Sequence, residues 1–344
     1  MSKEITVQEA LALPGVKFID VRSENEFSEA TLPGAVNIPL LRDWERVAVG
    51  TTYKQQGVDD ARSLGLEFVS PRLPQMIKEY RQIAPEGPLV VFCWRGGMRS
   101  RSICSLIESV GIPVFRLTGG YKAYRRYVNE YLTPPLPHKV VVLHGLTGVG
   151  KTEVLQELAL LSAPAIDLEG LANNRGSVFG QIGLAPQPSQ KMFEGLLVKE
   201  LAFLESAGHI IVECESRRIG RIVLPVSLVE GMRTGTRILT YTSLHERTER
   251  IKRIYGGEFG HNLQDLTAAI MSLTQRLGKN KVAQLIEMLE HEQLNEVVGY
   301  LLVNYYDPLY KYPSQPSDGY DLCVDTTDIK RAAIQINKFL GNKI

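Results

Sequence analysis

The sequence predicts an α/β protein of two domains, each built on a parallel sheet. A chain of 344 residues is too long for one ordinary hydrophobic core. Strand-like apolar runs alternate with helical patterns, and several runs are apolar throughout, as strands buried on both faces are. A cluster of prolines at 134–137 ends the helical pattern that precedes it. We therefore expect one domain at 1–133, a linker at 134–138 and a second domain at 139–344.

The first domain contains three apolar runs that predict strands and two amphipathic stretches that predict helices. The strands are expected at 16–21, 89–93 and 113–117, and the helices at 100–111 and 121–132. After the prolines the same alternation returns. Strands are expected at 139–144, 164–168, 209–214, 236–242 and 320–326. Residues 261–310 instead predict consecutive amphipathic helices appended to the second domain.

Composition describes a soluble globular protein, with 44% hydrophobic and 22% charged residues. The formal charge of +1 means that a nucleic-acid partner would have to be met by local basic patches. None of the four cysteines belongs to a C-x-x-C pair, which argues against a zinc site or a disulfide framework. The N-terminus does not match a signal peptide, and no apolar run approaches the ~18 residues of a membrane span. We expect a cytoplasmic protein with no membrane partner.

Cys93 ends an apolar strand and is followed within eight positions by Arg95, Arg99 and Arg101. The thiolate is the reactive form of cysteine, and nearby cations and the N-terminus of a following helix favour it. We therefore predict that Cys93 is a nucleophile open to solvent, in a loop that holds an anion with the help of Arg95 and Arg99. The other cysteines fall inside predicted helices or strands, where packing as small core residues is the simpler interpretation: Cys104, Cys214 and Cys323.

A phosphate-binding loop opens the second domain. The stretch GLTGVGKT satisfies G-x-x-x-x-G-K-[ST], with a predicted strand before it and a helix after it, which is the context that this motif requires. Glycines allow backbone N–H groups to surround a phosphate, the lysine supplies a positive charge, and the threonine hydroxyl can hold Mg²⁺. The motif predicts binding of a di- or triphosphate without saying which. The residues concerned are Gly145, Gly148, Val149, Gly150, Lys151 and Thr152.

Acidic residues follow a later strand of the second domain. Glu213 and Glu215 stand where a P-loop protein usually carries an acidic residue near the metal, and we predict Glu213 as part of the phosphate site. A plain carboxylate facing solvent at the strand end is the alternative. Asp167 is a rival for the same role.

Two segments of the first domain resemble the flanking signatures of the rhodanese family. They span 18–40 and 114–128, and the matching residues are Asp20, Arg22, Glu26, Pro33, Gly34, Ala35, Asn37, Ile38, Pro39, Leu117, Gly119 and Gly120. The resemblance implies that Cys93 carries a chalcogen as a persulfide-type intermediate. Five residues separate Cys93 from Arg99, one more than in many single-domain rhodaneses. This longer loop resembles that of dual-specificity phosphatases and favours a phosphate-like donor.

The two domains together resemble the tRNA 2-selenouridine synthase family over nearly the whole chain. The stretches that carry this resemblance are CWRGGMRS, residues 49–65, GLTGVGKT and IVECESRRIG. The resemblance implies an enzyme that replaces the 2-thio sulfur of a wobble uridine in tRNA with selenium from selenophosphate. It also implies that geranyl diphosphate can alkylate that sulfur first. On this basis we expect Cys93 to carry a selanyl intermediate and the P-loop to hold geranyl diphosphate or a nucleotide, with Mg²⁺ an option and no tightly bound metal.

A tRNA partner requires a basic surface. Arg217, Arg218 and Arg221 follow a strand end, where substrates of such sheets approach, and we predict that they contact tRNA phosphates. Two other basic stretches, 244–253 and 121–127, are also candidates for RNA contact, the second by stacking of its tyrosines. A salt-bridged face explains the first stretch equally well, and helix packing explains the second. The segment 41–65, with Trp44 and Tyr53, is either a tRNA-facing or an interdomain element.

Two other functions remain open at this stage. A rhodanese-type sulfurtransferase or phosphatase fused to a P-loop kinase explains each domain but not their fusion. A first domain that is only a regulatory or binding module is disfavoured, because Cys93 and its neighbouring arginines are intact.

Overall fold

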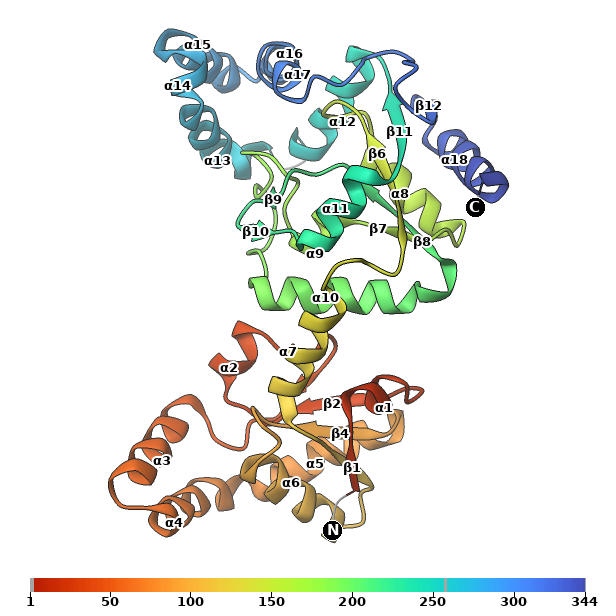
Figure 1. The fold of residues 1–344 in the computed structure, drawn as a ribbon. Coiled ribbons are helices and arrows are strands. Elements are labelled where there is room, and N and C mark those ends of the chain that lie inside the picture. The colour runs from red at the N-terminus through yellow and green to blue at the C-terminus, as the bar shows by residue number, and fades with distance from the viewer. Residues whose placement is uncertain (1–2, 257–258, 344) are drawn as a thin grey trace. The chain divides into compact units, whose positions relative to one another are not determined.

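The computed structural model describes residues 3–256 and 259–343 and divides the chain into two compact units (Figure 1). One unit comprises residues 1–131 together with 189–198, and the other comprises 132–188 and 199–344. Each unit contains a five-stranded parallel sheet with helices around it, which confirms the predicted fold class.

The sheet of the first unit has the strand order β1-β5-β4-β2-β3. Its strands are β1 (Lys3–Ile5), β2 (Lys17–Asp20), β3 (Val36–Asn37), β4 (Leu89–Phe92) and β5 (Val114–Leu117). The central strand β4 is apolar and buried along its whole length, because helices cover both faces of a parallel sheet. The three predicted strands are confirmed as β2, β4 and β5. The edge strands β1 and β3 are only three and two residues long, and no apolar run in the sequence predicted them.

The helices of the first unit pack around that sheet. They are α1 (Val7–Leu11), α2 (Glu24–Glu29), α3 (Asp43–Gln55), α4 (Val58–Val69), η1 (Ser70–Arg72), α5 (Leu73–Ile83), η2 (Ala84–Glu86), α6 (Met98–Ser109) and α7 (Gly120–Tyr131). The core between sheet and helices includes Val91, Ile103 and Ile107, all at most 1% exposed. Helices α3 and α4 form the segment after β3 and pack against each other, and Val69 at the end of α4 is part of the core under the sheet (Figure 1).

The second unit has the strand order β12-β11-β6-β8-β7, again parallel throughout. Its strands are β6 (Lys139–His144), β7 (Ala165–Ile166), β8 (His209–Glu213), β11 (Thr236–Tyr241) and β12 (Leu322–Asp325), with a separate antiparallel pair β9 (Arg218–Ile219) and β10 (Ile222–Val223). All five predicted strands are confirmed. Because the sheet is parallel, the loops after β6, β7 and β8 meet at its carboxyl edge.

The helices of the second unit fall into two groups. Those around the sheet are α8 (Lys151–Leu160), α9 (Leu168–Ala172), η3 (Glu205–Ala207), α11 (Val226–Thr234), α12 (Leu244–Gly256) and α18 (Ile329–Lys343). Helix α10 (Gln190–Phe203) begins in the first unit and ends in the second. The others form the predicted helical segment: α13 (Phe259–Ser272), α14 (Thr274–Leu277), α15 (Lys279–Glu290), α16 (Leu294–Leu301), η4 (Leu302–Tyr306) and α17 (Asp307–Tyr310). This helical segment has its own buried cluster, distinct from the core under the sheet.

None of the described helices is both long enough and apolar enough to span a bilayer.

Candidate thiol and phosphate sites

The P-loop joins β6 to α8 and is held in a conformation that needs its glycines. Gly145, Gly148 and Gly150 all have positive φ angles, and a side chain at Gly145 would overlap the carbonyl oxygen of Thr240. Lys151 Nζ donates to the carbonyl oxygen of Gly145 at 3.0 Å and to that of Leu146 at 3.4 Å. The lysine of the motif therefore folds back over its own loop, with its ammonium group at the place where a phosphate would lie.

Helix α12 holds the P-loop through two buried arginines. Arg247 donates from Nε to the carbonyl oxygen of Thr147 at 2.7 Å and forms an ion pair with Asp307. Arg250 donates to the carbonyl oxygens of Val149, at 2.9 Å, and Thr326. Both arginines are at most 4% exposed. The interpretation of this basic stretch as a solvated or RNA-facing surface is wrong for these two residues.

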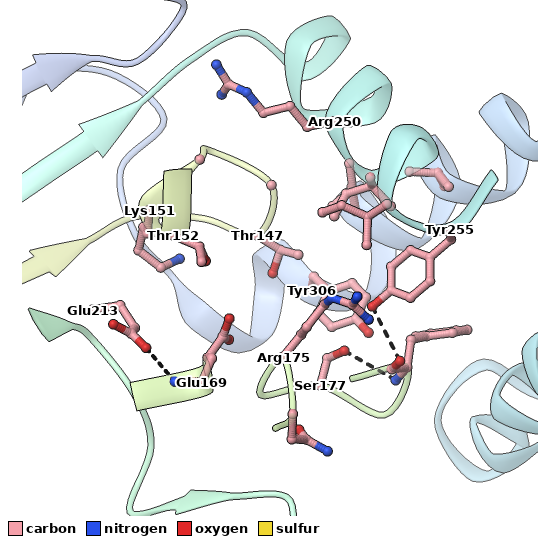
Figure 2. A pocket seen from close by; sticks show the side chains of 18 of the residues that line it. Thr147, Lys151, Thr152, Glu169, Arg175, Ser177, Glu213, Arg250, Tyr255 and Tyr306 are labelled. Atoms are coloured by element: carbon pink, nitrogen blue, oxygen red, sulfur yellow. Dashed lines mark hydrogen bonds between the residues drawn. The ribbon is translucent and has the colours of Figure 1, made fainter. Parts of the chain in front are cut away.

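Glu213 is buried beside the P-loop, so the alternative of a solvent-facing carboxylate is wrong. It is 1% exposed and accepts a hydrogen bond from the backbone N–H of Glu169 at 2.8 Å (Figure 2). Its second oxygen has no partner within the described residues. Burial, followed by the charge of Asp167, raises the pKa of Glu213 to about 8. Burial and the neighbouring Glu169 raise the pKa of Glu215 to about 9.

Asp167, the predicted rival of Glu213, has a local structural role. Its carboxylate accepts from the backbone N–H of Gly170 at 2.7 Å and caps helix α9. Across residues 3–256 and 259–343, no three His, Cys, Asp or Glu side chains are grouped so that they could hold a metal ion together.

A cavity of about 410 Å³ extends from the P-loop into the helical segment. Figure 2 shows Lys151 and Thr152 on one side of it and Tyr255 and Tyr306 on another. The polar part is lined by Gly145, Gly148, Gly150, Lys151, Thr152, Glu169, Glu213 and Glu215; the apolar part is lined by Ile251, Ile254, Leu266, Ile270, Leu289, Leu294, Val297, Val298, Leu301 and Leu302. Such a cavity suits a ligand with an anionic head and an apolar tail. The sequence predicts these helices, but their amphipathic period does not distinguish an apolar face that packs from one that lines a cavity.

Cys214 was predicted to pack in the core as a small apolar residue, and this prediction is wrong, because it is only partly buried. It lines this cavity and lies 3.1 Å from the hydroxyl of Tyr312. Cys323 is also only partly buried and bonds to the backbone of Ser317. Cys104 is fully buried in the core, as predicted, and burial raises the pKa of its thiol to about 12.

Cys93 stands at the exit of β4, directly before the loop that leads into α6. The residue is only 3% exposed, and its Sγ lies 3.3 Å from the hydroxyl of Ser100. The expectation of a thiol open to solvent is therefore wrong for this structure. Ser100 was overlooked in the sequence, although it stands at the third position of the helix that follows the cysteine. Within the described ranges, the backbone N–H groups of residues 94–100 donate to no other backbone group, as an anion-holding loop requires.

The arginines near Cys93 do not converge on its sulfur. Arg95 and Arg101 are exposed. Arg99 forms an ion pair with Glu26 at 2.7 Å. Burial raises the pKa of Glu26, but the hydrogen bond and charge of Arg99 outweigh it, so the net pKa lies below the usual range. The roles of Arg95 and Arg99 at an anion stay predictions.

The glycine pair at the start of α7 packs against the cysteine loop. Gly120 has φ +58°, and a side chain there would overlap the carbonyl oxygen of Cys93 and the nitrogen of Gly96. The next residue, Tyr121, donates its backbone N–H to the carbonyl oxygen of Cys93 at 2.9 Å. This close approach of two backbones explains why the segment needs glycine at that position.

Arg22 is a further residue of this site whose role the sequence did not reveal. It is 1% exposed, forms an ion pair with Asp20, and lies 4.1 Å from the centre of the Tyr121 ring and 5.9 Å from that of Trp94. Tyr121 and Tyr124 are buried, so stacking of these two rings on RNA is excluded in this structure. Trp44 and Tyr53, by contrast, are 60% and 56% exposed.

The three arginines predicted to contact tRNA differ in whether their side chains already bond to other protein groups. Arg217 and Arg218 are exposed at the β9–β10 pair, and no ion pair engages them within the described residues. The guanidinium group of Arg221 is committed to the carbonyl oxygens of Gln187 and Pro188. Contact with tRNA stays a prediction for all three, and Arg217 and Arg218 are the better placed.

The fold is that of a two-domain α/β protein, with a cysteine at a strand end in the first domain and a P-loop followed by added helices in the second. Family models agree with both parts: residues 6–127 match the rhodanese-like domain, and residues 138–327 match the tRNA 2-selenouridine synthase AAA domain. The chain belongs to the tRNA 2-selenouridine synthase family.

Relatives bearing that name match both domains together. The tRNA 2-selenouridine synthase of Chromohalobacter salexigens is 36% identical, covering 89% of this chain and 90% of its own length. That of Pseudomonas syringae pv. syringae is 35% identical, covering 88% and 90%. Among solved structures, the N-terminal domain of a protein described as ATP/GTP-binding, from Clostridium difficile 630, is 42% identical over 37% of this chain and 98% of its own, with a TM-score of 0.36.

Proposed function

We propose that this chain is a tRNA-modifying transferase that replaces the 2-thio sulfur of a wobble uridine with selenium from selenophosphate. The names of the relatives support the overall reaction, and their match across both domains makes an unrelated sulfurtransferase and kinase fusion the weaker explanation. We further propose that the sulfur is first geranylated at the P-loop, and that the Cys93 loop serves the selenium step.

The observation that carries the geranyl step is the cavity that continues from the P-loop into an apolar pocket. The diphosphate of geranyl diphosphate would lie against the loop N–H groups, Lys151 and the N-terminus of α8, and its hydrocarbon tail would lie among leucine, isoleucine and valine side chains. A nucleotide would instead place a polar base and ribose against those side chains, at a cost in desolvation.

The bond changes follow from this placement. The sulfur of the uridine forms a bond to C1 of the geranyl group, the C1–O bond breaks, and diphosphate leaves with the electron pair. Lys151 and the loop N–H groups stabilise the charge that develops on the leaving oxygen. The alkylated uridine gives up its N3 proton. When selenium then bonds to C2, the C2–S bond breaks and the sulfur leaves as geranylthiolate, which takes up a proton, while water cleaves the Se–P bond of selenophosphate and releases phosphate; alkylation makes the sulfur the better leaving group in this step.

Mass spectrometry of the modified nucleoside tests this function. The protein is incubated with 2-thiolated tRNA and with selenophosphate and geranyl diphosphate, added separately and together. We expect S-geranyl-2-thiouridine with geranyl diphosphate alone, and 2-selenouridine when both are present. The Lys151→Ala variant should lose the geranyl product, whereas Lys139→Ala, exposed at the opposite end of β6, should keep it. Normal geranylation by Lys151→Ala would show that the P-loop does not bind the diphosphate.

A further inference from the structure

We propose that the helical segment measures the length of the prenyl chain, and that Leu289 forms the wall at the end of the cavity that limits it to a geranyl group. This inference rests on the proposed function, because it needs a prenyl diphosphate at the P-loop. It adds the residues that decide which prenyl diphosphate is accepted.

Helix α12 gives the direction of the cavity. Near the P-loop, the Ile251 side chain lies 3.1 Å from where a Cβ on Gly148 would be. Five residues further along the same helix, a Cβ on Gly256 would lie 3.3 Å from Leu294 of α16. Five residues of α-helix advance about 7.5 Å. The cavity therefore leads from the phosphate end along α12 towards α16.

Helices α13, α15 and α16 line the part of the cavity towards which α12 leads. Leu266 and Ile270 contribute from α13 and Leu294 and Val297 from α16, whereas α15 contributes only Leu289. Helix α15 packs against α13, α14 and α16 and keeps its apolar face buried. Removing the Leu289 side chain would thus deepen the cavity into the helical core and would not open it to solvent.

The size of the cavity supports a short prenyl chain. Its volume of about 410 Å³ is near the lower end of the ~300–1,000 Å³ typical of small-molecule sites. A further isoprene unit adds five carbons, which on this assignment would run into Leu289, a residue that is 1% exposed. When two substrates differ by one methylene in an apolar pocket, the ratio of their kcat/KM values changes ~10–200-fold.

Leu285 provides a matched control. It lies one turn before Leu289 on α15, is equally buried at 1% exposure, and belongs to the same buried cluster. It does not line the cavity. Leu285→Ala and Leu289→Ala should therefore lose similar stability, while only Leu289→Ala changes the shape of the cavity.

The experiment compares kcat/KM for dimethylallyl, geranyl and farnesyl diphosphates on 2-thiolated tRNA, with mass spectrometry of the product. We expect Leu289→Ala to raise the ratio of farnesyl to geranyl transfer about tenfold or more, and Leu285→Ala to leave it as in the wild type. Ile270→Val, a smaller change on α13, should raise the same ratio and replaces Leu289→Ala if that variant does not fold. Val297→Phe should shift preference towards dimethylallyl diphosphate.

The possible results distinguish a failure of the proposed prenyl transfer from a failure of the proposed role of Leu289. A wild-type protein that transfers no prenyl group from any of the three donors would overturn the proposed function. A wild-type protein that geranylates tRNA, with farnesyl to geranyl ratios unchanged in Leu289→Ala and Ile270→Val, would overturn only the assignment of the wall.

Discussion

Glu213 is a carboxyl group held where a negative charge is poorly solvated. Its side chain is buried beside the P-loop, near Asp167 and Glu169, and burial is the main reason that its pKa is raised to about 8. One of its oxygens accepts a backbone N–H, and that contact survives whether or not the group is charged. In the ligand-free protein, Glu213 therefore holds a proton near neutral pH.

This raised pKa predicts how stability depends on pH. The folded protein binds the proton of Glu213 more tightly than the unfolded chain, whose glutamate keeps its ordinary pKa of 4.5. The contribution of Glu213 to the free energy of unfolding is therefore fully present below pH 4.5, and it is lost as the pH rises towards 8. At ~1.36 kcal/mol per pKa unit, its upper limit is about 5 kcal/mol. Glu213→Gln should therefore reduce the loss of unfolding free energy between about pH 5 and pH 8.

Urea unfolding of the ligand-free protein at several pH values measures this effect. Glu205→Gln, an exposed carboxyl just before β8, is the control and should leave the pH dependence as in the wild type. If Glu213→Gln loses as much stability as the wild type across this range, the assignment of a proton to Glu213 is wrong.

Helix α12 has one side that contacts the P-loop and another that is exposed to solvent. Its sequence, LHERTERIKR, carries four basic residues, but Arg247 and Arg250 are turned inward to the P-loop while Arg253 remains exposed. The spacing of three residues places the two inward arginines on one side of the helix. They bond to carbonyl oxygens at both ends of the loop tip, those of Thr147 and Val149. Part of the phosphate site is thus built by an element about 100 residues away in sequence.

Removal of Arg250 should loosen the phosphate loop. Arg250→Met leaves the carbonyl oxygen of Thr326 without its buried donor, at a cost of ~1–3 kcal/mol, whereas the carbonyl oxygen of Val149 keeps the hydrogen bond from the Thr326 hydroxyl. We expect lower stability in urea and a higher KM for geranyl diphosphate. Arg253→Met on the exposed side of α12 is the matched control. Equal KM values for the two variants would show that the loop does not depend on Arg250.

At the scale of the whole molecule, the chain contains two sheets with separate cores and a different candidate site at each. The thiol of Cys93 belongs to the core of the first unit, and the P-loop belongs to the sheet of the second. Since each site is completed by side chains of its own unit, a substitution in one should leave the other assembled.

This independence predicts opposite products from two variants. Cys93→Ser should abolish selenation while geranylated tRNA accumulates, because the P-loop and its cavity are unchanged. Cys104→Ala, in the same core but away from the loop, should retain selenation. The products are measured by nucleoside mass spectrometry with both donors present. Unchanged selenation by Cys93→Ser would remove this cysteine from the mechanism.

Local patterns predicted the strands and the P-loop because each depends on neighbouring residues. The run KVVVLH is apolar enough to be a central strand wherever it lies, and GLTGVGKT needs only a strand before it and a helix after it. The strands β1 and β3 escaped prediction, since two or three residues become a strand only when a neighbouring strand pairs with them. The position of Cys93 at a strand end was predicted, but its 3% exposure depends on side chains folded over it.

The sequence by itself determined the fold class, the phosphate loop, the family and the place of the thiol at the end of its strand. Each of these depends on short stretches of neighbouring residues. Only the tertiary structure decided that Glu213 is buried, that Arg247 and Arg250 support the P-loop, and that an apolar cavity extends from it. Burial and cavity shape are set by residues far apart in the chain, whose approach is decided when the helices and sheets pack.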